Sequence, residues 1–194
     1  MEKIIQKFES KKNEYSDIHE HLETLRRYAL ECDRICEMGV RAIVSTWAFL
    51  ASNPEKMISI DYYNPENFGS SIKEVEGICD EYNISFKFIL ANTLEVEIDE
   101  CDLLFIDTWH DYKQLKMELY RHHTKVTKYI ILHDTNSFAF KNEPFYETYD
   151  SEREITNLPQ GLIPAIDEFL CKNPQWYVYE RFANNNGLTI LKKI

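Results

Sequence analysis

Short apolar runs that end at a charged or imidazole side chain recur along the chain. Residues 103–106 are apolar and stop at Asp107, and residues 129–132 are apolar and stop at His133. An apolar run of this length between polar residues is typical of a strand buried on both faces. Residues 112–123, which lie between the two runs, have apolar positions at helical spacing. The stretch therefore predicts a strand, a helix and a second, parallel strand.

Acidic and imidazole side chains follow both of these strands. Asp107 and His110 come after the first strand, and His133 and Asp134 come after the second. Parallel strands joined by a helix end at the same edge of a sheet, where open α/β sheets bind their ligands. We therefore expect these four side chains to converge.

The same alternation of strand and helix extends over residues 1–194, which we predict to be a single domain. Further strands are predicted at residues 34–38, 57–60, 84–90, 176–182 and 188–191, and further helices at residues 45–51, 70–82 and 161–170. The last two strands are joined by Asn-Asn-Asn-Gly, which favours a hairpin. The predicted fold is α/β: a doubly wound, Rossmann-like mixed sheet of about seven strands with a C-terminal antiparallel hairpin and helices on both faces.

Two segments lie outside this alternation. Residues 1–31 predict one or two helices, with Ser16 or Asp17 as N-cap. They share one apolar face, formed by Ile18, Leu22, Leu25 and Ala29. This segment covers the site or pairs with another subunit, so a homo-oligomer stays open. Residues 137–161 are rich in aromatic, acidic and turn residues, which favours a substrate loop or lid.

Composition limits the classes of partner. The net charge of -11 argues against nucleic acid and against an anionic membrane surface, so we expect a small-molecule substrate. The first residues lack a secretory signal, and no apolar run is long enough to span a membrane, so we expect a cytoplasmic protein. The five cysteines are scattered and predict buried free thiols. Cys32 and Cys36 have no second pair to complete a zinc site.

A nucleoside site is indicated by Gly39 and Asp61. Strand, glycine turn and helix form the nucleotide cradle of doubly wound folds, and Asp61 ends the next strand about twenty residues later. A carboxylate there can accept the hydroxyls of a ribose, although Asp61 can equally just end the strand. A dinucleotide fingerprint needs three glycines, and only Gly39 is present, so close approach of a pyrophosphate is disfavoured.

Together these motifs resemble class I S-adenosylmethionine (SAM)-dependent methyltransferases. The resemblance is closest to the small-molecule O-methyltransferase branch, with its catechol-type, cephalosporin-biosynthetic and macrolide-sugar members. It covers nearly the whole chain, and its motifs are CEMGVRAIVSTWA, MISID, FIDTWHDY, IILHDT and NNNGLTIL. The order and spacing of the five motifs make it specific.

The resemblance implies roles for the residues at these positions. Glu37 and Gly39 would line the methionine end of SAM, Asp61 would hold the ribose, and Asn92 or Thr93 would lie beside the adenine. Ser45 and Asp107 also match cofactor-binding positions. Ile43 and Val44 stand where relatives have a small residue.

The resemblance also implies a divalent metal and a base. Metal-dependent relatives bind magnesium through an Asp at position 107 and an acidic pair at positions 133 and 134, so the candidate ligands are Asp107, His133 and Asp134. Because imidazole suits iron better than magnesium, the metal is Mg, Mn or Fe, or else His133 does another job. His110 is the candidate base, with Asp107 beside it. Alternatively, His110 caps the next helix or packs beneath Trp109.

The leading hypothesis is a SAM-dependent methyltransferase acting on a hydroxyl of a small molecule, such as a sugar or a glycosylated metabolite. An NAD-dependent oxidoreductase shares the glycine turn and the ribose acid, but it is disfavoured by the missing glycines and the terminal hairpin. A non-catalytic nucleoside-binding protein on the same fold is the third hypothesis. His122 and His123 are expected on the outer helix, away from the site, and His19 and His21 beside the N-terminal helix, facing solvent or a neighbour.

Overall fold

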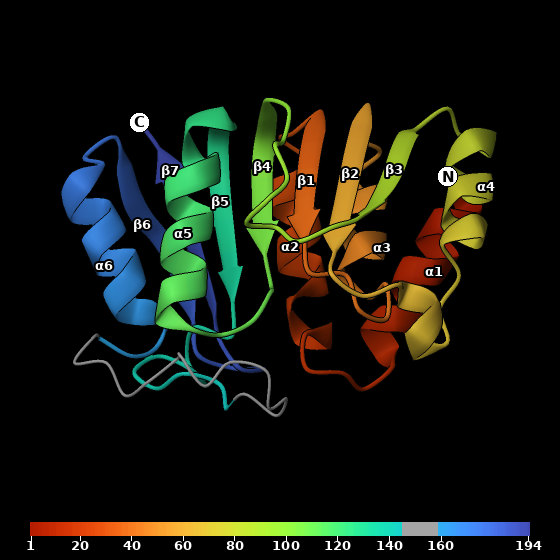
Figure 1. Cartoon of the computed structure of the whole chain (residues 1–194). Coiled ribbons are helices and arrows are strands. Elements are labelled where there is room, and N and C mark those ends of the chain that lie inside the picture. Colours follow the sequence, from red (N-terminus) through yellow and green to blue (C-terminus); the bar gives the residue numbers. More distant parts are fainter. Residues whose placement is uncertain (145–158) are drawn as a thin grey trace.

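The computed structural model describes residues 1–144 and 159–194. In this part of the chain, seven strands form one sheet that is covered by helices on both faces (Figure 1). The strands are β1 (Arg34–Met38), β2 (Lys56–Asp61), β3 (Ser85–Leu90), β4 (Cys101–Ile106), β5 (Val126–His133), β6 (Trp176–Phe182) and β7 (Leu188–Lys193). The helices are α1 (Glu2–Asn13), α2 (Leu22–Ala29), α3 (Ser45–Leu50), α4 (Ile72–Glu81), α5 (Tyr112–His122) and α6 (Leu162–Lys172), with short 3-10 helices η1 (His19–His21), η2 (Pro65–Phe68) and η3 (His123–Lys125).

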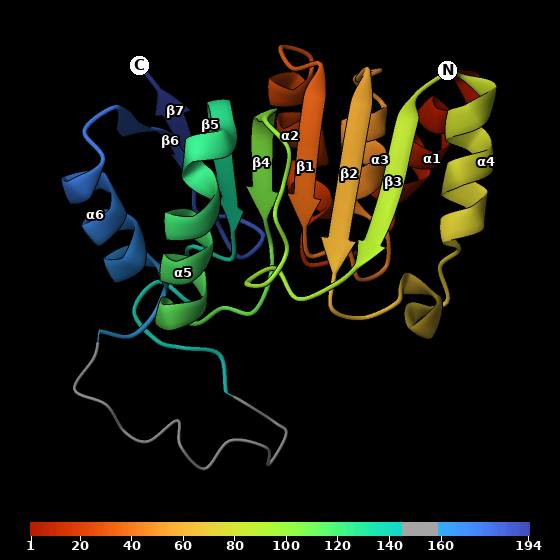
Figure 2. The ribbon, with the colours of Figure 1, turned by 45° about the horizontal axis from the view of Figure 1, so that its top comes forward.

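The strand order is β3-β2-β1-β4-β5-β7-β6. The first five strands in this order are parallel, and β7 is antiparallel to both of its neighbours, β5 and β6. This arrangement confirms the predicted mixed sheet and terminal hairpin. In Figures 1 and 2 the arrowheads of β1, β2, β4 and β5 point to one edge of the sheet, so the loops that follow these strands lie together.

The core has one apolar layer on each face of the sheet. Side chains from α1, α2, α3 and α4 pack on one face, and side chains from α5 and α6 pack on the other. Every residue of β4 is buried, as expected for a central strand whose two faces are both covered. The apolar runs of the sequence therefore mark the middle of the sheet.

The N-terminal segment keeps its predicted apolar face but not its predicted cap. Its four apolar residues are buried: Ile18, Leu22, Leu25 and Ala29. The prediction of Ser16 or Asp17 as N-cap is wrong, because α2 begins at Leu22, after the η1 turn, with His21 at the N-cap position. The side chain of Asp17 instead forms an ion pair with Arg41, and the backbone carbonyl of Ser16 lies 2.7 Å from the ring of His19.

The cysteines are free thiols, and all except the exposed Cys171 are buried. Within residues 1–144 and 159–194, none of the helices combines the length and the apolar character needed to cross a bilayer.

Candidate functional site

The carboxyl ends of the central parallel strands bring the predicted site residues to one rim. Strand β1 lies between β2 and β4, so Asp61 and Asp107 flank the turn that begins at Gly39. The amide of Gly39 donates to Ile60 O at 2.9 Å, and the amide of Asp107 donates to Met38 O at 2.8 Å. These two bonds extend the pairing of the strands to the rim and hold Asp61 and Asp107 on the same edge.

Gly39 is required by close backbone packing. Its φ is +86°, and a Cβ added there would lie 1.9 Å from the carbonyl oxygen of Asp107. No side chain fits in this space, so the turn after β1 can pack directly on the end of β4.

The turn after Gly39 holds two non-glycine residues in the left-handed region. Arg41 has φ 46° and Ile43 has φ 57°, which is rare for a β-branched side chain. Both oxygens of the Asp61 carboxylate hold this region: Oδ2 accepts from the amides of Val40 at 2.7 Å and Arg41 at 2.9 Å, and Oδ1 accepts from the amide of Tyr63 at 2.7 Å. Asp61 thus fixes the turn after β1, which the sequence predicted as part of a nucleoside site.

Glu37 lies beneath this turn and is fully buried. Its carboxylate accepts hydrogen bonds from the hydroxyls of Ser45, Thr46 and Ser59 at 2.6 to 2.8 Å. Burial raises the pKa of Glu37, the three hydroxyls lower it in part, and the result is a pKa of about 7. Glu37 and Ser45 therefore bind each other and join β1, β2 and the start of α3.

The predicted adenine residues form part of a second polar network. The Thr93 hydroxyl donates to Glu118 at 2.5 Å, and the Thr108 hydroxyl donates to the other oxygen of the same carboxylate at 2.9 Å. The backbone carbonyl of Thr93 also lies 2.8 Å from Nε2 of His122. His122 is the last residue of α5, the helix on which it was expected, and its buried side chain supports the loop that carries Asn92, whose side chain donates to Glu95.

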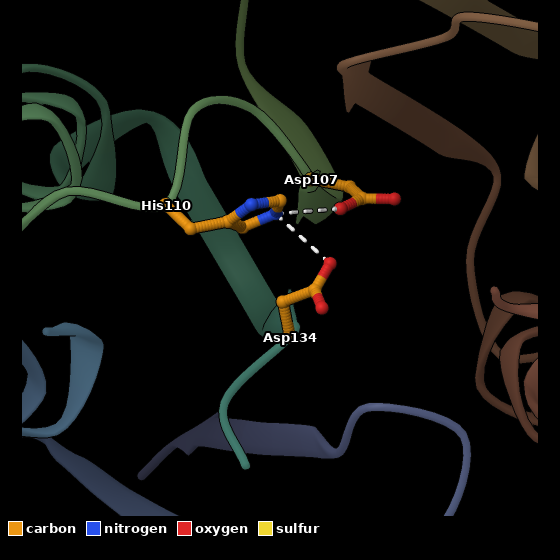
Figure 3. A group of neighbouring side chains, drawn as sticks. All are labelled: Asp107, His110 and Asp134. Carbon is orange, nitrogen blue, oxygen red and sulfur yellow. Dashed lines mark hydrogen bonds and ion pairs between the residues drawn. The ribbon is translucent and has the colours of Figure 1, made fainter. Parts of the chain in front are cut away.

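Asp107, His110 and Asp134 converge at the ends of β4 and β5 (Figure 3). Nε2 of His110 lies 3.3 Å from Asp107 Oδ1 and 2.9 Å from Asp134 Oδ2. Asp134 has φ 58°, a conformation that is uncommon outside glycine and that recurs at functional sites. One ligand atom from each of the three side chains lies within 4.8 Å of the others, so the group can hold a cation.

His133 lies behind the two carboxylates and has a fully buried side chain. Its Nδ1 is 3.3 Å from Asp107 Oδ1 and 3.0 Å from Asp134 Oδ2, and its Nε2 is 3.1 Å from the backbone oxygen of Asn185. The predicted metal ligands are thus adjacent, with His110 on the more open side of the carboxylates.

The carboxylates and the imidazoles of this cluster stabilise each other's charged forms. Burial alone lowers the pKa of both histidines, but Asp107 and Asp134 outweigh it and raise the pKa of His110 to about 11 and of His133 to about 10. Burial raises the pKa of the two carboxyls, but the histidines outweigh it and hold both below their ordinary range. Both imidazoles are therefore cationic at neutral pH in this arrangement.

The beginning of the predicted substrate loop closes one wall of the site. Glu143 Oε2 lies 2.9 Å from Nδ1 of His110. The ring of Phe138 stacks on the His110 ring, with a centroid distance of 4.8 Å and an angle of 4° between the ring planes. Asn142 Oδ1 accepts from the amides of Tyr112 and Gly161, which joins the two ends of the loop. Residues 145–158 of this loop lie outside the described residues.

Glu118 and Glu143 were not singled out in the sequence. Neither ends an apolar run, since Glu118 lies within α5 and Glu143 lies in the long loop. The signal available for Glu118 was an acidic residue one position before Leu119 on the buried stripe of α5. Such a residue must find a partner when the helix packs.

Comparison with known proteins supports the fold and goes no further. No protein-family model matches the chain, and no curated protein matches its sequence. SAH-bound methyltransferase PaMTH1 from Podospora anserina matches with a TM-score of 0.57 at 14% identity, covering 98% of this chain and 87% of that one. Cofactor-bound Rv0187 from MTB matches with a TM-score of 0.60 at 12% identity, covering 98% and 87%.

A third solved structure is the 1,6-didemethyltoxoflavin-N1-methyltransferase of Burkholderia thailandensis, with S-adenosylhomocysteine and 1,6-didemethyltoxoflavin bound. It has a TM-score of 0.53 at 12% identity, covering 88% of this chain and 79% of that one. At these identities the likeness shows that the chain has the fold of these methyltransferases. The fold predicted from the sequence resemblance is therefore confirmed.

Proposed function

We propose that this protein is a SAM-dependent methyltransferase that acts on a hydroxyl of a small molecule, such as a sugar or a glycosylated metabolite. The observation that carries the proposal is the rim: Asp61 and Asp107 flank the Gly39 turn, and His110 and Asp134 lie beside Asp107. A nucleoside acid and an acid-imidazole cluster thus occupy neighbouring positions on one edge of the sheet.

The chemistry of Asp61 fits the ribose of SAM. A carboxylate has about four acceptor positions, and the amides of Val40, Arg41 and Tyr63 occupy three of them. One position remains on Oδ1, and Asp61 is only partly buried, so it can accept a ribose hydroxyl without giving up the turn. Glu37 is enclosed by hydroxyl groups, and its proposed role at the methionine end is to hold the turn in shape.

The start of α3 argues against a dinucleotide. A pyrophosphate in that fold binds the amides at the N-terminus of the first helix. Here Ser45 and Thr46 at the start of α3 are buried, and their hydroxyls are bound to the Glu37 carboxylate. The two negative charges of a pyrophosphate at this position would lie close to the Glu37 carboxylate. SAM, which has no pyrophosphate, is therefore favoured over NAD.

The acid-imidazole cluster fits a divalent metal. Asp107 and Asp134 offer two carboxylate oxygens, and Nδ1 of His133, which faces both carboxylates, offers one nitrogen. Such a mixed donor set suits manganese or iron better than magnesium. A bound ion would act as a Lewis acid and lower the pKa of the acceptor hydroxyl.

His110 is the proposed base. SAM supplies an electrophilic methyl group when bound, so the protein must hold the acceptor oxygen in line and remove its proton. Glu143 accepts the Nδ1 proton of His110, which leaves Nε2 as the nitrogen that takes the proton from the acceptor. The parallel stacking on Phe138 fixes the plane of the ring.

The test is a comparison of His110→Ala with His123→Ala, in which the second histidine lies in η3. We expect His110→Ala to bind S-adenosylhomocysteine with the affinity of the wild type and to lose methyl transfer to hydroxyl acceptors. His123→Ala should keep both. Unchanged turnover in His110→Ala would show that His110 is not the base. No turnover by the wild type with a broad panel of acceptors would contradict the methyltransferase activity itself.

A further inference from the structure

The hairpin turn between β6 and β7 packs against the site. The backbone oxygen of Asn185 accepts a hydrogen bond from Nε2 of His133 at 3.1 Å. The backbone oxygen of Asn186 accepts from the amides of Asn136 at 2.8 Å and Ser137 at 2.9 Å. The turn therefore holds both His133 and the chain that follows Asp134.

The asparagine side chains of this turn bind the N-terminal segment. Asn185 Oδ1 accepts from the amide of Glu20 at 3.0 Å, and Asn185 Nδ2 donates to Ser16 O at 3.2 Å. Asn184 Nδ2 donates to the Glu20 carboxylate at 2.6 Å, and Asn184 O accepts from Nε2 of His21 at 2.9 Å. The turn is thus anchored by four bonds to a segment more than 160 positions away in the sequence.

The N-terminal segment also contacts the site directly. His21 is buried, and its ring meets the ring of His133 edge-on at a centroid distance of 5.7 Å. On the other side, Asp17 pairs with Arg41 at 2.6 Å, and the amide of Arg41 donates to Asp61. The segment therefore connects the turn after β1 with the histidine behind the acidic pair.

We propose that Ser16–His21 together with Asn184 and Asn185 form a brace that positions His133. The brace places the carbonyl of Asn185 so that it keeps the Nε2 proton of His133, which leaves Nδ1 facing Asp107 and Asp134. Partners that orient a histidine in this way fix which ring nitrogen points at the site, in either charge state of the ring. Asn185 is a positioning residue, and its effect on turnover rests on the proposed function.

The test is Asn185→Gly, with Asn83→Gly as the matched control. Both asparagines have positive φ, 42° and 58°, so glycine keeps each backbone conformation and removes only the side chain. Asn83 lies in the turn before β3, away from the rim. The first readout is the exchange rate of the His133 Nε2 proton, measured by NMR on 15N-labelled protein and assigned by its loss in His133→Asn.

We expect Asn185→Gly to speed this exchange at least about tenfold and to lower turnover by about 10-fold to 100-fold, as for other residues that orient site ligands. S-adenosylhomocysteine affinity should stay within about twofold, and Asn83→Gly should change none of these.

An unchanged exchange rate in Asn185→Gly would contradict the brace. If that variant does not fold, Asn184→Ala, which keeps its carbonyl, replaces it, and unchanged exchange there has the same meaning. Because the exchange is read without SAM, failure of the brace is distinguished from failure of the methyltransferase proposal.

Discussion

Gly39 and Asp107 touch through their backbones: a methyl group placed on the Cα of Gly39 would lie 1.9 Å from the carbonyl oxygen of Asp107. The contact joins the turn that the Asp61 carboxylate holds to the strand end that carries the acid-imidazole cluster. The two halves of the proposed site therefore share one rigid boundary. Any change at position 39 must move either the turn or the end of β4.

Gly39→Ala should destabilise the protein by about 3 to 5 kcal/mol, the sum of left-handed strain and overpacking. The measurement is chemical denaturation followed by circular dichroism. Gly69→Ala is the control, because Gly69 has φ +75° but open space where a Cβ would lie, so only strain of about 1 to 2 kcal/mol is expected. Equal losses in the two variants would contradict the backbone contact.

Glu37 makes stability depend on pH. Its folded pKa of about 7 is above the ordinary value of 4.5, so the folded state keeps a proton that the unfolded state releases as pH rises between these values. The free energy of unfolding should therefore fall by about 3 kcal/mol from this group across that window. Glu37→Gln removes the titration, so the difference in unfolding free energy between variant and wild type should change with pH. A constant difference from pH 4 to 8 would contradict the assignment.

Methyl transfer should rise with pH. His110 must be neutral to accept a proton, and Asp107 and Asp134 raise its pKa to about 11, so the neutral fraction grows through the neutral and alkaline range. The measurement is initial rate against pH without added metal, over the range in which circular dichroism shows the fold intact. Added manganese should move the curve to lower pH, because a cation at the carboxylates opposes the imidazolium charge. A rate that falls from pH 6 to 9 would exclude His110 as the base.

Asp61→Asn should weaken binding of S-adenosylhomocysteine. The change removes a charged acceptor, worth about 1.5 to 3 kcal/mol, which is about tenfold to 150-fold in affinity. Asp80→Asn, an exposed carboxylate on α4, should bind like the wild type. If both variants bind equally well, Asp61 does not hold the ribose.

The main features of the rim were predictable from the sequence because they depend on strand ends. Asp61, Asp107 and Asp134 each follow an apolar run, and parallel pairing alone brings such positions to one edge. The N-cap at Ser16 or Asp17 was not predictable, because these two residues instead contact Asn185 and Arg41, which are distant in the sequence. Glu118 was missed for a similar reason, since two of its three partners, Thr93 and Thr108, lie outside its own helix.

The position after Gly39 shows a second limit of sequence patterns. Arg41 and Ile43 adopt left-handed backbone conformations that usually favour glycine, so the turn keeps its shape although the glycines are missing. The missing glycines disfavour a dinucleotide, but they say nothing of the shape of the turn. That shape depends on Asp61, which binds the amides of Val40 and Arg41 from the neighbouring strand.

The proposed SAM-type nucleoside site at the Gly39 turn is tested most directly by calorimetric titration of the purified protein with S-adenosylhomocysteine and, separately, with NAD. We expect saturable one-to-one binding of S-adenosylhomocysteine that Asp61→Asn weakens, and no heat of binding with NAD. Saturable binding of NAD with none of S-adenosylhomocysteine would contradict it.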